Sequence, residues 1–273
     1  MQDAMWLAGL AVAMAATGLL SGLLAGLLGV GGGIVIVPVL FTVFPLFGIA
    51  ESVQMKLAVG TSLATIVPTS IVSARQHFAK GTMDVPLLRS LAPSIAAGVL
   101  AGTLLGVHAR GAVHTAIFAA IALAVAVHMA ATGADWRLRD SFPRGAIRHA
   151  IGAFIGGVSA MMGIGGGTVG VPLLSMFGAP MRSAVATASA FGVIISIPAS
   201  IGFIYGGWGD PALPPLSLGY VNLLGFALIV PTSLIAAPWG VQLAHAIPQL
   251  LLKRLFAAFL AATVLRMCWS LAV

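Results

Sequence analysis

The chain has 273 residues, of which 60% are hydrophobic and only 7% are charged, and its mean hydropathy is +1.10. Soluble domains carry about 25% charged residues, so this composition argues against a soluble enzyme, a nucleic-acid-binding protein and a disordered chain. The sequence predicts an integral membrane protein. Its net charge of +7 agrees with the excess of Lys and Arg in the cytoplasmic loops of membrane proteins.

Cysteine and histidine usage argues against a metal or thiol centre. The single cysteine, Cys268, cannot form an intramolecular disulfide or a thiolate cluster, and the six histidines show no His-Glu-x-x-His pattern. We therefore expect no metal, no cofactor and no enzymatic activity. The first residues lack the basic stretch of a cleaved signal peptide.

Apolar stretches predict ten segments in two sets of five, giving an all-α membrane protein with about eight to ten membrane segments. A transmembrane helix needs about 20 apolar residues. The expected segments are 4–28, 33–48, 55–75, 87–107 and 111–132, followed by 147–163, 167–178, 183–205, 216–239 and 248–271. Segments 33–48 and 167–178 are short, which suits re-entrant or broken segments, and full crossings are the alternative.

The two halves of the chain repeat. Residues Gly29–Pro38 recur as Gly163–Pro172, and residues Met55–Thr61 recur as Met181–Thr187. With the second spacing, Gly81 aligns with Gly207 and Asp84 with Asp210. We therefore divide the chain into a first repeat (1–133), a basic cytoplasmic linker (134–146) and a second repeat (147–273).

An odd number of segments per repeat predicts that the second copy inserts upside down. The charges of the loops agree with this inversion, because basic residues mark the cytoplasmic side. The basic loop residues expected in the cytoplasm are Arg75, Lys80, Arg89, Arg137, Arg139, Arg144, Arg148, Lys253 and Arg254, whereas Gly206–Pro215 carries only Asp210. This topology places both termini in the periplasm. Inverted repeats are typical of secondary transporters.

Small residues form two ridges. Gly18, Gly22 and Gly26 are spaced by four residues, as are Gly98, Gly102 and Gly106. Such ridges let neighbouring helices approach closely. We expect them to pack helices within one subunit, with a homodimer interface as the alternative.

Two glycine clusters predict the substrate site. Each interrupts an apolar stretch, and unpaired backbone persists in a membrane only where protein or a water-filled cavity satisfies it. A helix that starts after such a break directs its N-terminal amides at the break, which favours an anion. The candidate residues are Gly31, Gly32, Gly33, Gly165, Gly166 and Gly167. Tight helix packing without a ligand is the alternative.

The two glycine motifs, each followed by an Ala-x-x-Thr helix, resemble those of the TauE/SafE family of sulfite and sulfonate exporters over essentially the whole chain. The resemblance implies a bacterial inner-membrane transporter of small sulfur-containing anions such as sulfite, sulfoacetate or another organosulfonate. The second copy departs from the first, with Ala186 in place of Gly60 and Ala188 in place of Ser62. Ser189 could supply the second hydroxyl there.

Four hydroxyls near the starts of the third helix of each half are further candidates for binding the anion: Thr61, Ser62, Thr187 and Ser189. A hydroxyl donates one hydrogen bond, which suits an oxyanion. The alternative is a bond back to a helical carbonyl of the same helix.

Four residues could steer or gate the anion: Lys56, Arg75, His77 and Arg182. Lys56 and Arg182 occupy equivalent positions in the two halves, although a basic side chain at an interface also snorkels to lipid headgroups. His77 and His128 could carry a coupling proton, or could be structural. We interpret Arg266 as an interface anchor.

The sequence therefore predicts a secondary transporter of small anions that works by alternating access, with export as the expected direction. The alternatives are an anion channel and an uptake system for a different small organic anion. The expected partners are the anion and membrane lipid, without nucleic acid.

Overall fold

The computed structural model describes residues 2–28, 31–109, 111–131 and 137–248, and then 250–251, 254, 257–258, 261–262 and 264–265. The helices are α1 (Gln2–Leu28), α2 (Gly33–Val43), the 3-10 helix η1 (Phe44–Phe47), α3 (Glu51–Ala79), α4 (Val85–His108), α5 (Gly111–Ala131), α6 (Ala146–Met162), α7 (Gly167–Met176), α8 (Met181–Gly206) and α9 (Leu223–Ala246). The strands are β1 (Ser217–Leu218) and β2 (Val221–Asn222).

Among the residues that the structure describes, five helices are long and apolar enough to cross a membrane, namely α3, α4, α5 from Val113, α8, and α9 as far as Ala244. The chain is therefore a mostly helical, multi-pass membrane protein, as predicted. Most of the predicted segment 248–271, including Lys253, Arg266 and Cys268, lies outside the described residues.

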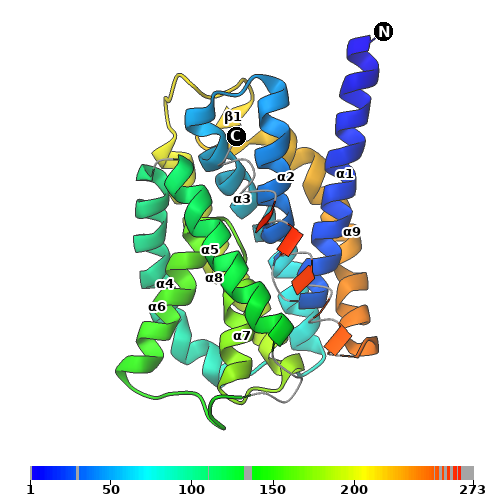
Figure 1. The fold of residues 1–273 in the computed structure, drawn as a ribbon. Coiled ribbons are helices and arrows are strands. Elements are labelled where there is room, and N and C mark those ends of the chain that lie inside the picture. The colour runs from blue at the N-terminus through cyan, green and yellow to red at the C-terminus, as the bar shows by residue number, and fades with distance from the viewer. Residues whose placement is uncertain are drawn as a thin grey trace.

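The helices α2 and α7 are too short to cross the membrane. They have 11 and 10 residues, which gives about 15 Å at 1.5 Å per residue, half of the roughly 30 Å hydrocarbon core. In Figure 1, α1 descends from the upper end and α2 returns toward it, whereas α6 rises from the lower end and α7 returns there. The two glycine breaks are thus the tips of two helical hairpins that enter from opposite ends.

The predicted segment 216–239 is wrong at its start. An antiparallel hairpin pairs Ser217 with Asn222 and Leu218 with Val221, and α9 begins only at Leu223. Two features place a short hairpin before the later start of α9. Gly219 has a positive φ of 53°, which suits a tight turn, and the Asn222 side chain accepts the N–H of Gly225 as the helix cap.

The glycine ridges pack helices together inside the chain. A Cβ on Gly22 would lie 2.2 Å from the carbonyl oxygen of Ser233 in α9, and one on Gly102 would lie 2.0 Å from that of Gly157 in α6. The ridges therefore let α1 pack against α9 and α4 against α6, as expected for one subunit. Gly106 instead faces Phe203 and His114. The homodimer remains a prediction.

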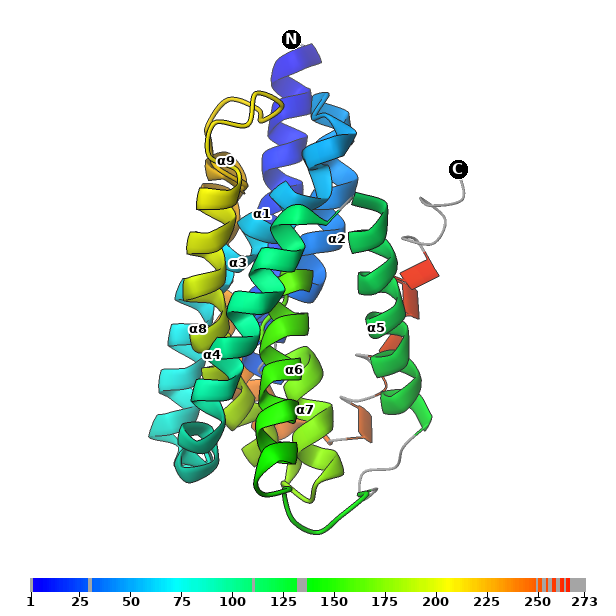
Figure 2. The same cartoon turned by 90° about the vertical axis from the view of Figure 1, so that its left-hand side faces the viewer.

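The helices α3 and α8 form the centre of the protein. Within their most apolar windows, 67% and 72% of residues are buried, against 39–44% in α4, α5 and α9, whose outer faces are left for lipid. In Figure 2, α4 and α8 lie on one side of the molecule and α5 on the other.

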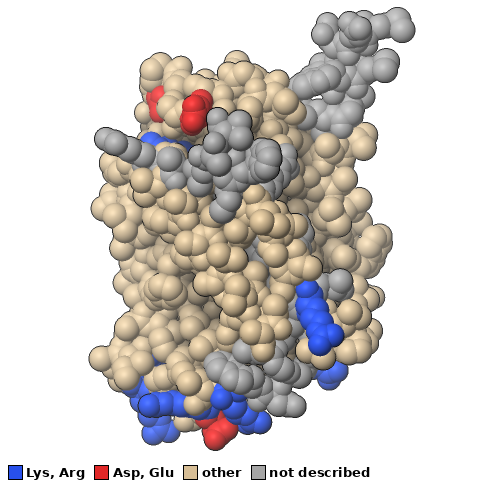
Figure 3. Space-filling view, in the orientation of Figure 1, with Lys and Arg blue, Asp and Glu red and all other residues tan. Residues whose placement is uncertain are grey.

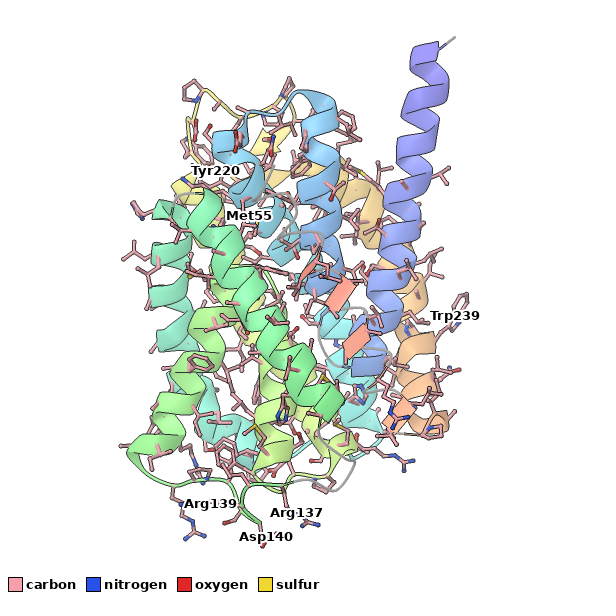
Figure 4. The ribbon with its side chains drawn as sticks, in the orientation of Figure 1. Met55, Arg137, Arg139, Asp140, Tyr220 and Trp239 are labelled. Carbon is pink, nitrogen blue, oxygen red and sulfur yellow. The ribbon has the colours of Figure 1, made fainter. Side chains whose placement is uncertain are left out.

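Basic residues gather at the lower end of the molecule (Figure 3). Figure 4 places Arg137, Arg139 and Asp140 in the loop at that end, between α5 and α6. The predicted linker 134–146 coincides with this connection, of which 132–136 lie outside the described residues. The division into two repeats remains a prediction.

Candidate functional site

The two glycine breaks meet inside the protein. A Cβ on Gly33 would lie 2.3 Å from the carbonyl oxygen of Gly163, and one on Gly31 would lie 3.3 Å from the Cα of Gly165. Gly31, Gly32 and Gly163 have φ angles of 70°, 80° and 69°, which only glycine adopts at little cost. The breaks therefore contact each other backbone to backbone.

Protein atoms fill the space beside both breaks. A Cβ on Gly32 would lie 2.6 Å from the carbonyl oxygen of Ser21, and one on Gly166 would lie 2.4 Å from the Cβ of Phe191. All six candidate glycines (Gly31, Gly32, Gly33, Gly165, Gly166 and Gly167) are buried. The structure thus brings the predicted glycines together in a closed arrangement.

Side chains bind the carbonyls at the ends of the broken helices. The last carbonyls of a helix lack intrahelical partners, and lipid cannot supply any. Ser73 and His77 of α3 donate to the carbonyls of Ala25 and Gly26 in α1, at 3.4 and 3.2 Å. These bonds hold α3 against the first break.

The second break is held in the same way by residues of the first half. His114 of α5 donates from Nε2 to the carbonyl of Met161 near the end of α6. Ser62, a predicted substrate residue, donates to the carbonyl of Gly163 at 2.7 Å. The hydroxyl of Ser62 therefore fastens α3 to the second break in this arrangement.

The threonine pair holds two helix caps. Thr61 Oγ1 accepts the backbone N–H of Asn222 at 2.8 Å, and Thr187 Oγ1 accepts that of Asp84 at 3.0 Å. Asn222 and Asp84 in turn cap α9 and α4. A hydroxyl oxygen that accepts a hydrogen bond keeps its own hydrogen for donation, so both threonines can still donate to an anion.

The hydroxyl of Ser189 bonds within its own helix in this arrangement. It donates to the carbonyl of Ala186 in its own helix at 2.7 Å, which is the alternative considered for serines in membrane helices.

Comparisons with known proteins identify the family of this chain. The family profile described as Sulfite exporter TauE/SafE matches residues 14–267. The chain belongs to this family. A probable membrane transporter protein of Haemophilus influenzae is 35% identical over 250 residues, which cover 92% of this chain and 95% of the relative. A probable membrane transporter protein of Methanocaldococcus jannaschii is 28% identical over 226 residues, covering 81% and 78%. No solved structure matches the chain.

The four steering candidates of this TauE/SafE transporter lie in different surroundings. Arg75 and Arg182 are exposed, Lys56 is half-buried and His77 is buried. Helix α8, whose second residue is Arg182, begins at the lower end of the molecule (Figure 1). Met55, which precedes Lys56 in α3, lies toward the upper end (Figure 4). The structure therefore does not bring Lys56 and Arg182 together.

Lys56 belongs to a small polar cluster at the upper end. Its Nζ lies 5.4 Å from the centroid of the Tyr220 ring, within the range of a cation–π contact. The Tyr220 hydroxyl donates to Asp210 at 3.0 Å. Burial, and then this bond to a carboxylate, raise the pKa of Tyr220 to about 12. The cluster ties the β-hairpin to α3.

A cavity of about 190 Å³ opens beside this hairpin, and its lining is almost entirely apolar. It lies between α1, η1 and the residues that precede α9. Asn222, which binds Thr61 through its backbone, is its one polar lining residue among those described. In the described part of the chain no three His, Cys, Asp or Glu side chains cluster as metal ligands would.

Two residues that organise the site, Asn222 and His114, were not predicted from the sequence. The spacing of the repeat aligned Asp84 with Asp210, but Asp84 caps α4 whereas the cap of α9 is Asn222. The connection from α8 to α9 is longer than the one from α3 to α4. A constant spacing therefore aligns Asp84 with Asp210 and not with Asn222. No sequence motif marks His114, because its hydrogen-bond partner is a backbone carbonyl of α6 and not a side chain.

Proposed function

We propose that this TauE/SafE transporter exports small sulfur-containing anions, such as sulfite, sulfoacetate or another organosulfonate, across the bacterial inner membrane by alternating access. The family membership supports the substrate class. The observation that carries the proposal is the contact between the two glycine breaks at the tips of opposed hairpins. Broken helices that meet at the membrane midplane are typical of substrate sites in secondary transporters.

Matching contacts in the two halves support an inverted repeat. α1 packs on α9 of the other half, as α6 packs on α4. Thr61 binds the cap residue of α9, as Thr187 binds that of α4. A pair of related halves provides two alternative arrangements of similar energy, which alternating access requires.

The donors of the site would be neutral. An uncompensated charge is very costly to bury, and Arg75 and Arg182 are exposed. Amides at the N-termini of α2 and α7, together with the hydroxyls of Thr61 and Thr187, are suitable donors for an anion. Neutral donors also let the anion leave again.

The orientation follows from the charges. Basic residues concentrate at the lower end, in the loop that holds Arg137 and Arg139. The positive-inside bias assigns that end to the cytoplasm and the start of α1 to the periplasm. The predicted periplasmic C-terminus lies outside the described residues.

Flux through proteoliposomes tests the proposal. We expect saturable sulfite or sulfoacetate transport, with faster uptake of labelled anion when the same anion is inside. Flux that rises without saturation would instead support an anion channel. Saturable exchange of carboxylates alone would support a transporter for another organic anion.

The threonine pair tests the position of the site. We expect Thr61→Val and Thr187→Val each to weaken anion binding by roughly 1–3 kcal/mol, the range for a hydrogen bond to a charged group. Thr61→Ser and Thr187→Ser keep the hydroxyl and serve as matched controls with near-normal affinity. Unchanged affinity in the double valine variant would move the site toward Lys56 or Arg182.

A further inference from the structure

Three buried hydroxyls around the second glycine break have no hydrogen-bond partner among the described residues. They belong to Ser159, Thr168 and Ser196, whose relative exposure is 0%. A buried hydroxyl without a partner costs about 1–3 kcal/mol, and buried polar side chains are nearly always paired. These three hydroxyls therefore require an explanation.

Each hydroxyl comes from a different helix at this break. Ser159 lies in the last turn of α6, and its carbonyl accepts the N–H of Ile164 inside the break. Thr168 lies in the first turn of α7. Ser196 of α8 follows Ile195, whose Cδ1 lies 2.9 Å from where a Cβ of Gly166 would stand. The three helices that supply these hydroxyls therefore meet at the break.

Three serine hydroxyls of α3 in the first half, in contrast, have partners. Ser62 donates to the carbonyl of Gly163 at the second break, and Ser73 donates to that of Ala25 in α1. Ser70 aligns with Ser196 in the repeat, yet it donates to the carbonyl of Ile66 at 2.7 Å. Ser62, Ser70 and Ser73 thus use their hydrogens in bonds within the protein, whereas Ser159, Thr168 and Ser196 keep theirs.

We propose that the second break holds the oxygen atoms of the substrate, with Ser159, Thr168 and Ser196 as its three hydroxyl donors. An oxyanion offers only hydrogen-bond acceptors, so it suits hydroxyls whose hydrogens have no acceptor in the protein. The N-terminus of α7 adds a positive dipole end at the same place. Three donors suit the three oxygens of a sulfite or sulfonate group better than the two oxygens of a carboxylate. This inference rests on the proposed function and specifies its substrate class.

Binding measurements on the purified full-length protein test this inference. The probes are methanesulfonate and acetate, which differ only in the acidic group, and sulfite. We expect Ser159→Ala, Thr168→Val and Ser196→Ala each to weaken methanesulfonate and sulfite binding about tenfold or more, as the loss of a hydrogen bond to a charge does. The preference for methanesulfonate over acetate should fall in parallel.

Thermal unfolding without ligand separates binding from structure. Each of the three variants should unfold at the same temperature as the wild type or at a higher one, because it removes an unpaired polar group. Ser70→Ala is the matched control for Ser196→Ala, and it should lower the unfolding temperature and leave affinity unchanged. Thr168→Ser should keep both properties.

The outcomes distinguish the two proposals. If the wild type binds none of the three probes, the proposed function fails, and the inference fails with it. If the wild type binds them and the three variants bind equally well, the inference alone is overturned. A variant that loses stability without ligand would show that its hydroxyl has a structural partner, which also overturns the assignment.

Discussion

Gly33→Ala tests whether the two breaks pack against each other. The change adds one methyl group at a position with an ordinary φ, so backbone strain does not contribute. The new Cβ would lie 2.3 Å from the carbonyl oxygen of Gly163, 2.9 Å from the Cα of Ile164 and 2.7 Å from the Cδ1 of Ile66. The first two neighbours are backbone atoms, which cannot rotate away as a side chain can.

The expected loss follows from two opposed terms. Overpacking costs about 1–3 kcal/mol, and rigid backbone neighbours place this case near 3 kcal/mol. Replacing a helical glycine by alanine recovers up to about 1 kcal/mol of helix propensity. The net loss is therefore about 2 kcal/mol, which lowers the unfolding temperature by roughly 4–8 °C in a protein of this size. Transport should be abolished.

Unfolding followed by intrinsic fluorescence in detergent, together with proteoliposome flux, measures both effects. Gly111→Ala is the control, because its Cβ would lie 3.8 Å from the nearest neighbouring atom. If Gly33→Ala unfolds at the same temperature as Gly111→Ala and still transports, the breaks do not pack together as described.

Three further predictions concern the membrane topology, the polar cluster of Lys56, Tyr220 and Asp210, and the bond of Ser62 at the second break. After replacement of Cys268, thiol reagents should label Trp208→Cys from the periplasm and Arg139→Cys from the cytoplasm; labelling of both from one face would refute the inversion. In a titration followed by tyrosinate absorbance, the signal of Tyr220 should have its midpoint near pH 12, and Tyr220→Phe should remove that signal. Because the folded state raises this pKa, its stabilising effect is present below pH 10 and is lost as the pH rises toward 12; a midpoint near 10 would show an exposed phenol. Ser62→Ala should destabilise the protein by about 1–3 kcal/mol by leaving a buried carbonyl of the second break unpaired; unchanged stability would contradict that bond.

Hydropathy and glycine spacing were enough to predict the main elements. The start of α7 at Gly167 and the end of α6 at Met162 follow from glycines that an apolar helix tolerates poorly. The shortness of 33–48 and 167–178 predicted segments that do not cross fully. The repeated Thr61 and Thr187 were recognised because two copies of one motif carry them. All of these signals are local in the chain.

Only the tertiary structure decided which groups bind to each other. Ser62 and Ser189 are both helical serines in apolar surroundings, yet Ser62 donates to Gly163 in the other half and Ser189 to its own helix. Likewise Ser70 and Ser196 align in the repeat, but Ser70 has a partner and Ser196 has none among the described residues. Membrane insertion depends on the apolar content of each segment, whereas the partner of a buried polar group depends on which distant backbone packs beside it.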